Sequence, residues 1–214
     1  MNLQTETLAK NWETCTSPEV LNKIQDKDVN IAIFNREIGQ LKNEIEHLLE
    51  LNIEVRTSGD IDSILDSISQ IIDPKDFGLI IQDIHELLKL FKNASEANSF
   101  RLLLATVNNN MCRRFHTDIN DLRMLCTYDG PGTLWLTEDN IERNALNSRG
   151  DNECIVLDES NIQQAKTGAV VILKGAMYPA KGTNAVVHRS PTIEESGATR
   201  LLLRIDTNEF LNFI

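Results

Sequence analysis

The chain has 214 residues, of which 41% are hydrophobic and 25% are charged, and its formal net charge is -11. A chain of this size and composition can bury a core of its own and is typical of a globular protein rather than a disordered one. The acidic balance argues against a nucleic-acid partner, because neutralising phosphates requires clustered lysine and arginine side chains.

The sequence also argues against a membrane partner and against export. No segment contains the roughly eighteen consecutive apolar residues that a spanning helix needs, and residues 1–11 lack the basic start and apolar run of a secretory signal. We therefore expect a cytoplasmic protein. The cysteines form no CxxC pair, so that neither a disulfide framework nor a zinc ribbon is predicted. We expect most of them to be small buried residues, with Cys112, four residues before His116, as the likeliest exception. The cysteines are Cys15, Cys112, Cys126 and Cys154.

Residues 1–99 are predicted to be a mainly helical region. The apolar run at 29–34 indicates a strand, which we expect to join a sheet edge. Apolar residues then recur every three or four positions in helices beginning near Ile38, Ser63 and Phe77. Because short amphipathic helices offer little core by themselves, we expect their apolar stripes to pack on the outside of a sheet.

From residue 100 to residue 214 the helical period gives way to short β-prone runs separated by Gly, Pro and Asn. About eight such runs favour a double-sheet jelly roll or a small barrel. The predicted fold class is thus α+β, with a jelly-roll metal-site domain at 100–214 and the helices of 1–99 packed on its outside. The predicted strands lie near 101–107, 112–117, 122–128, 133–136, 153–157, 169–173, 184–188 and 200–206.

The sharpest local pattern is His116-Thr117-Asp118 at the end of a β-prone run. Side chains two residues apart on a strand point to the same side, so that the imidazole and the carboxylate can converge on one ion. We predict that His188, on a later strand, supplies the third ligand. Two histidines and one carboxylate, which leave other positions of the ion open, are the ligands that non-heme Fe(II) oxygenases use.

The order of these segments resembles the Fe(II)/2-oxoglutarate dioxygenase superfamily, whose core is a double-stranded β-helix. The pattern is His-x-Asp, a distal histidine and a basic residue on the last core strand, which here is Arg200 or, four residues later, Arg204. The resemblance implies that one of these arginines grips 2-oxoglutarate, since an arginine fork binds a carboxylate with two hydrogen bonds. Tyr128, on the strand after His-x-Asp, is implied to help hold the same cosubstrate.

At closer range residues of the C-terminal half resemble an uncharacterised bacterial family, domain of unknown function 1826. Members are commonly associated with zinc-responsive genes, which implies a link to metal supply without naming a reaction. The matching segments are 114–118, 127–136, 173–175, 188–191 and 200–206.

Three functions remain open from the sequence. The first is an Fe(II)- and 2-oxoglutarate-dependent oxygenase acting on a small-molecule or peptide substrate, with catalysis at His116, Asp118 and His188. The second is a zinc-binding protein or zinc hydrolase that uses the same three ligands for Zn2+, and the third is a cupin-like binder of small molecules. An arginine after the distal histidine favours the oxygenase. The acidic N-terminal helices are left as a cap, a homodimer face or another partner surface.

Overall fold

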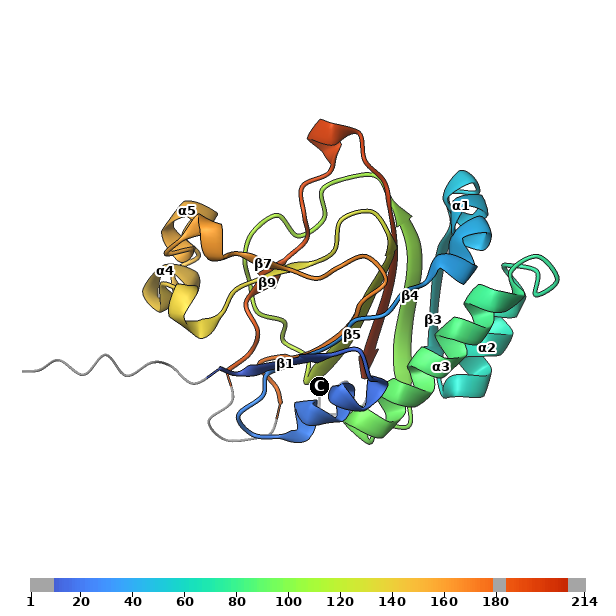
Figure 1. Cartoon of the computed structure of the whole chain (residues 1–214), viewed down its shortest axis with the longest axis horizontal. Coiled ribbons are helices and arrows are strands. Elements are labelled where there is room, and N and C mark those ends of the chain that lie inside the picture. Colours follow the sequence, from blue (N-terminus) through green and yellow to red (C-terminus); the bar gives the residue numbers. More distant parts are fainter. Residues whose placement is uncertain (1–9, 179–183, 208–214) are drawn as a thin grey trace, which may run out of the picture.

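The computed structural model describes residues 10–178 and 184–207, and these form an α+β molecule around one large sheet (Figure 1). The strands of this main sheet are β1 (Trp12–Cys15), β2 (Ile31–Phe34), β3 (Glu54–Gly59), β4 (Phe100–Val107), β5 (Leu122–Asp129), β8 (Val170–Lys174) and β10 (Arg200–Thr207). Among the described residues they follow the order β1-β2-β8-β5-β10-β4-β3. Neighbouring strands are antiparallel, apart from the parallel pair β1 and β2.

A second, smaller sheet has the order β7-β6-β9. Its strands are β6 (Leu134–Trp135), β7 (Gln163–Gln164) and β9 (His188–Arg189). The α-helices are α1 (Lys42–Glu50), α2 (Ile61–Ser69), α3 (Gly78–Ser95), α4 (Arg143–Asn147) and α5 (Asn152–Ile155). Short 3-10 helices are η1 (Pro18–Gln25), η2 (Gly39–Leu41), η3 (Glu138–Asn140), η4 (Glu159–Asn161) and η5 (Glu194–Ser196). In this described part of the chain, no helix is both long enough and apolar enough to cross a bilayer.

One face of the main sheet packs against the helices of the N-terminal half (Figure 1). Leu201, Leu203 and Ile205 of β10 belong to the same buried cluster as Leu87 and Phe91 of α3. These strand residues alternate in sequence, as they must when one side of a strand faces a helix layer. The helices starting near Ser63 and Phe77 are therefore present, and their apolar stripes pack on the sheet.

The other face of the main sheet looks toward the second sheet and its connecting loops. Its apolar cluster contains Leu103 of β4, Leu125 of β5 and Leu202 of β10, together with Trp135 of β6. Consecutive residues such as Leu202 and Leu203 thus enter different clusters on opposite faces of the sheet. The sheet is buried on both sides, and it separates a helical layer from a second β layer.

The N-terminal half contributes strands as well as helices. The predicted strand at 29–34 is present as β2, but it lies between β1 and β8 and not at the expected sheet edge. The two edges of the main sheet are β1 and β3, which the sequence did not predict. Both edges are rich in polar residues, as in Arg56-Thr57-Ser58 of β3, and lack the alternating apolar pattern that signals a half-buried strand. Strands from both sides of residue 99 therefore share one sheet.

Two predicted strands of the C-terminal half are wrong, and a third, at 184–188, is a strand only at His188, where β9 begins. Residues 153–157 begin with the short helix α5, because a short apolar run does not distinguish a strand from a buried helical turn. Residues 112–117 form only one isolated bridge, between His116 and His188. Here the Phe115 N–H donates to the Asn152 side chain at 2.8 Å instead of to a neighbouring strand.

Candidate metal centre

The two histidines are held side by side by a pair of backbone hydrogen bonds. The His116 N–H donates to the His188 carbonyl at 3.0 Å, and the His188 N–H donates to the His116 carbonyl at 3.0 Å. Residues that exchange both bonds in this way stand directly opposite each other, with their side chains on the same face. The ring centroids are 4.7 Å apart. Two imidazoles that are distant in sequence are thus brought together by backbone pairing.

Both imidazole rings are oriented by a carbonyl two residues earlier in the chain. His116 Nδ1 lies 2.9 Å from the Arg114 carbonyl oxygen, and His188 Nδ1 lies 3.1 Å from that of Val186. A carbonyl only accepts hydrogen bonds, so each Nδ1 carries the proton in the neutral ring and each Nε2 presents its lone pair. This is the usual arrangement around metal-binding histidines.

Asp118 completes the predicted group of ligands. Its Oδ1 is 3.7 Å from His116 Nε2, and its Oδ2 is 3.3 Å from His188 Nε2. One donor atom from each of the three residues lies within 4.8 Å of the others, close enough to surround one ion. His116 and His188 also line the neighbouring pocket, so an ion held by these three residues would have room there for further ligands. The structure therefore brings together the three residues that the sequence singled out.

The loop that carries Asp118 is held by the turn after β8. The Asp118 carbonyl accepts a hydrogen bond from Ala176 N at 2.8 Å, and the Asp121 carbonyl accepts one from Gly175 N at 2.6 Å. A Cβ atom on Gly175 would stand 2.0 Å from the Asn120 carbonyl oxygen, far inside van der Waals contact. Only glycine lets the two segments approach this closely, which accounts for Gly175 at the end of the matching segment 173–175.

Arg123 links Asp118 to a second buried carboxylate. Its Nη1 donates to Asp118 Oδ2 at 2.6 Å, and its Nε donates to Asp206 Oδ1, also at 2.6 Å. Asn120 Nδ2 donates to the same Asp206 oxygen at 2.9 Å. The sequence reasoning missed Arg123 and Asp206 as parts of the site. No local signal identifies them, because their connection depends on the pairing of β5 with β10.

These contacts keep the Asp118 carboxyl ionised. Burial opposes ionisation, but hydrogen bonding to His116 and His188 and the charge of Arg123 hold the pKa of Asp118 far below its usual range. In return, the interaction with Asp118 raises the pKa of His116, against the effect of burial. An ionised carboxylate and an imidazole that can give up its proton are the forms that bind a metal.

Arg200 lies in the same pocket as the two histidines. Its side chain is 1% exposed, its Nη2 donates to Thr127 Oγ1 at 3.0 Å, and its Nε has no hydrogen-bond partner. Desolvation lowers the pKa of the guanidinium to about 10. A buried cation whose donors are not all satisfied is costly unless a ligand pairs with it, and a carboxylate is the natural match for an arginine fork. Together with His116 and His188, Arg200 lines a pocket whose wall also contains Arg123, Leu125, Leu202 and Arg204.

The turn at Gly130-Pro131-Gly132 holds the Arg200 stem in place. Gly130 has a φ of +80°, a left-handed conformation that favours glycine. A Cβ atom at this position would lie 2.4 Å from the Thr199 carbonyl oxygen and 2.8 Å from Arg200 Cγ. The turn can therefore close over the start of β10 only because this residue is glycine.

Arg204 also reaches the pocket. It is two positions from Leu202 on the same face of β10, and its Nε is 3.3 Å from Asp206 Oδ2, although the geometry is not that of a hydrogen bond. Unlike Arg200, it faces a buried carboxylate and is about one-third exposed. Both candidate arginines thus lie beside the metal ligands, and Arg200 is the more enclosed of the two.

The expected place of Tyr128 beside Arg200 is corrected by the structure. Its side chain points to the helical face of the sheet, where its hydroxyl donates to Asp83 of α3 at 2.7 Å. Arg36 binds the same carboxylate, with its Nη2 2.9 Å from Asp83 Oδ2. Along β5 it is Arg123, Leu125 and Thr127 that face the pocket, and Tyr128 has the opposite orientation.

The expectation that most cysteines are buried is also wrong. Cys126 is buried beneath the helices, whereas Cys15, Cys112 and Cys154 are exposed. Cys112 lines the mouth of the metal pocket.

Comparisons with known proteins agree with this architecture. Residues 15–206 match the model of a family described as "Protein of unknown function (DUF1826)". No curated protein matches the chain significantly. The structure resembles that of AtDAO1, the dioxygenase for auxin oxidation 1 from Arabidopsis thaliana, solved with 2-oxoglutarate, with a TM-score of 0.53 and 11% identity over 92% of this chain and 91% of that one. It also resembles a putative oxygenase from Shewanella oneidensis, with a TM-score of 0.50 and 11% identity over 92% of this chain and 90% of that one. At this identity the likeness shows a shared fold.

Proposed function

The chain belongs to the DUF1826 family of proteins of unknown function, and we propose that it is a non-heme, Fe(II)- and 2-oxoglutarate-dependent oxygenase. The observation that carries this proposal is the joint placement of three metal-binding side chains and a buried, incompletely paired arginine in one pocket. A site that only held a metal would not need a buried cation beside it. A site that also binds a dicarboxylate does.

Each residue has a definite part in the proposed site. His116, Asp118 and His188 hold the metal, and Arg123 keeps the Asp118 carboxylate charged and oriented. Arg200 binds the far carboxylate of 2-oxoglutarate. The Thr127 hydroxyl, which accepts a hydrogen bond from Arg200, assists it. Bound Fe(II), together with 2-oxoglutarate and oxygen, would supply the oxidising chemistry. The protein's own contribution is to bind, orient and shield the reactants.

The two opposed sheets support a double-stranded β-helix as the description of the fold. In this proposal the main sheet and the β7-β6-β9 sheet are the two walls, and the metal ligands lie at the junction between them, where His188 of β9 pairs with His116. The helices α1 to α3 then form an outer layer that supports the main wall.

Anaerobic reconstitution with Fe(II) tests the oxygenase directly. Adding 2-oxoglutarate to the Fe(II)-loaded protein should produce a visible metal-to-ligand charge-transfer band. The His188→Ala variant should give no band, and Arg200→Ala should bind Fe(II) normally but need much more 2-oxoglutarate to produce it. If the wild-type protein holds Zn2+ tightly, and Fe(II) with 2-oxoglutarate gives neither a band nor oxygen consumption, the zinc alternative replaces the oxygenase.

A further inference from the structure

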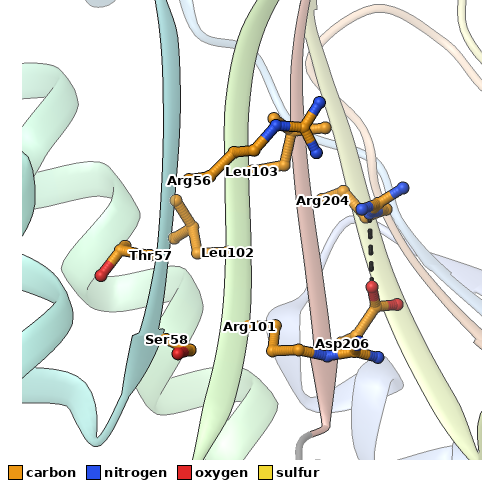
Figure 2. A pocket seen from close by; sticks show the side chains of 8 residues that line it. All are labelled: Arg56, Thr57, Ser58, Arg101, Leu102, Leu103, Arg204 and Asp206. Carbon is orange, nitrogen blue, oxygen red and sulfur yellow. Dashed lines mark ion pairs between the residues drawn. The ribbon is translucent and has the colours of Figure 1, made fainter.

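Beside the metal pocket, the same face of the main sheet carries a groove lined by arginines (Figure 2). Its position follows from the strand register. Arg56 of β3 stands opposite Leu103 of β4, and Leu103 stands opposite Arg204 of β10. Directly opposite residues present their side chains on the same face. Arg56, Leu103 and Arg204 therefore form one row across three neighbouring strands.

A second row runs parallel to the first. Ser58 of β3 stands opposite Arg101 of β4, and Arg101 stands opposite Asp206 of β10. Asp206 also stands opposite Arg123 of β5, the strand on the other side of β10. Arg123 in turn contacts the candidate metal ligand Asp118. The groove and the metal centre thus lie on one continuous surface, and Arg204 lines both the groove and the metal pocket.

The charge of the groove is opposite to that of the molecule. Among the described residues, its lining contains three arginines, Arg56, Arg101 and Arg204, and one carboxylate, Asp206. Glu54, the acidic residue of β3, pairs with Arg56 at 2.7 Å. The whole chain has a net charge of -11. A cluster of arginines in so acidic a protein favours a negatively charged ligand at this place, because clustered charges of one sign attract a ligand of the other.

Asp206 cannot neutralise all the guanidinium groups around it. Its Oδ1 accepts hydrogen bonds from Arg123 and Asn120, and Arg204 Nε stands 3.3 Å from its Oδ2 without a hydrogen-bonding geometry. Burial lowers the pKa of Arg204, and the charges of Arg123 and Arg56 lower it further despite Asp206. Asp206 is therefore shared between Arg123 and Arg204, and Arg204 has no carboxylate to itself among the described residues.

The groove is also accessible. The side chain of Arg56 is 61% exposed and that of Arg204 is 31% exposed. Toward the metal, the surface becomes apolar at Leu125 and Leu202, which line the metal pocket beside Arg204. A ligand that spans both regions therefore needs an acidic group at one end and an aliphatic part at the other.

We propose that this groove binds the acidic group of the primary substrate, a small organic acid whose aliphatic part extends over Leu202 and Leu125 toward the metal. The inference rests on the oxygenase proposal and adds the substrate class. It assigns a different ligand to each of the two candidate arginines: the enclosed Arg200 binds 2-oxoglutarate, and the more open Arg204 binds the substrate. A polyanion is a poor fit, because three arginines stand within a strongly acidic protein.

Binding of model acids to the full chain tests the groove. The protein is loaded with Mn(II) and saturating 2-oxoglutarate, so that Arg200 is occupied, and titrated calorimetrically with octanoate, octyl phosphate and the neutral control 1-octanol. Octanoate or octyl phosphate should bind at least about tenfold more tightly than octanol, since a charge-assisted hydrogen bond contributes more than one factor of ten. The tighter of the two acids identifies the substrate headgroup as carboxylate or phosphate.

The variants are chosen away from the metal ligands. Arg56→Gln and Arg101→Gln should each weaken binding of the preferred acid by about tenfold and leave octanol binding unchanged. Lys89→Gln, which removes one positive charge from the exposed surface of α3, is the matched control and should change binding less than twofold. Thermal unfolding of each variant checks that the sheet edge remains folded.

The outcomes separate this inference from the oxygenase proposal. Equal affinity for octanol and the two acids would overturn the proposal that the groove binds an acidic group. Wild-type affinity in both arginine variants would overturn it too. If 2-oxoglutarate fails to bind the wild-type protein while acid binding still depends on Arg56 and Arg101, the oxygenase proposal fails and the groove stands as an anion site. If both ligands bind and only acid binding responds to Arg56, both proposals are supported.

Discussion

The two faces of the main sheet are built from alternate residues of the same strands, and yet they differ in kind. On β10, Leu201 and Leu203 enter the helical cluster, while Arg200 and Arg204 face the metal pocket. On the helical face the Asp83 carboxylate is paired with Arg36 and Tyr128, and the buried Lys174 ammonium donates to the Asp26 carbonyl at 2.8 Å.

The opposite face keeps buried arginine atoms without hydrogen-bond partners, among them Arg200 Nε and Arg204 Nε. Native cores rarely tolerate such groups, and those that remain call for an explanation such as a ligand. We infer that the helical face serves stability and that the opposite face serves binding. The following predictions test this division, from the largest expected effect to the smallest.

Replacing His188 by alanine should remove the metal site while leaving the helical face intact. We expect the affinity for Mn(II) or Fe(II) to fall by more than about a hundredfold. Removing a residue that only supports a ligand typically costs about 10–100-fold in affinity, and removing a ligand should cost more. Calorimetric titration with Mn(II) measures this, and circular dichroism checks the fold. Global unfolding of the variant would show that this histidine is needed for the structure and that the two faces are not independent.

The adjacent leucines of β10 provide a matched pair. Leu203→Ala, on the helical face, should lower the free energy of unfolding by about 2–5 kcal/mol, because it opens a cavity in a fully packed core. Leu202→Ala should cost less stability, because this side chain borders an existing pocket. Urea denaturation of both variants compares them. A greater loss for Leu202→Ala would contradict the division.

Arg200→Met should separate binding from stability. Affinity for 2-oxoglutarate should fall by roughly 10–100-fold, as expected for lost charge-assisted hydrogen bonds. Stability should stay the same or rise, because an apolar side chain removes a buried, incompletely paired cation. Titration of the Fe(II) protein with 2-oxoglutarate and urea denaturation measure the two effects. A strongly destabilised variant would make Arg200 a structural residue.

Metal affinity should fall as the medium becomes more acidic. Asp118 raises the pKa of His116, so that below this raised pKa a metal ion must displace a proton from the imidazole. Affinity should then decrease by about tenfold for each pH unit below that pKa and level off above it. Mn(II) titrations at several pH values give the profile. A flat profile across the acidic range would show that His116 does not bind the metal.

Tyr128→Phe should give the smallest change and should affect only the helical face. Loss of its hydrogen bond to Asp83 should lower the free energy of unfolding by about 0.5–1.5 kcal/mol. The affinity for 2-oxoglutarate should not change, because the hydroxyl points away from the pocket. Weaker cosubstrate binding in this variant would restore the role that the sequence suggested for Tyr128.

The sequence alone identified the three candidate metal ligands, which the structure brings together, and much of the architecture. His116 and Asp118 are close in the chain, so that their convergence required only a local extended backbone, and the resemblance to a known pattern indicated His188 and Arg200. The helices at Ser63 and Phe77 were predictable because an amphipathic helix repeats its apolar positions over many residues. The strands near 101–107, 122–128 and 200–206 were predictable because long apolar runs are buried on both faces.

Only the tertiary structure decided which face each strand residue occupies. The role of Tyr128 at the cosubstrate site was implied by the resemblance alone, and the structure turns this residue to the helical face. Because β5 and β10 are buried on both sides, the sequence contains no apolar-to-polar alternation from which to assign their faces. The polar edge strand β3 was missed for the related reason that its pattern is not apolar. Arg56, Arg101, Arg123 and Asp206 come from four different strands, and they meet because strand register, a property of the folded sheet, aligns them.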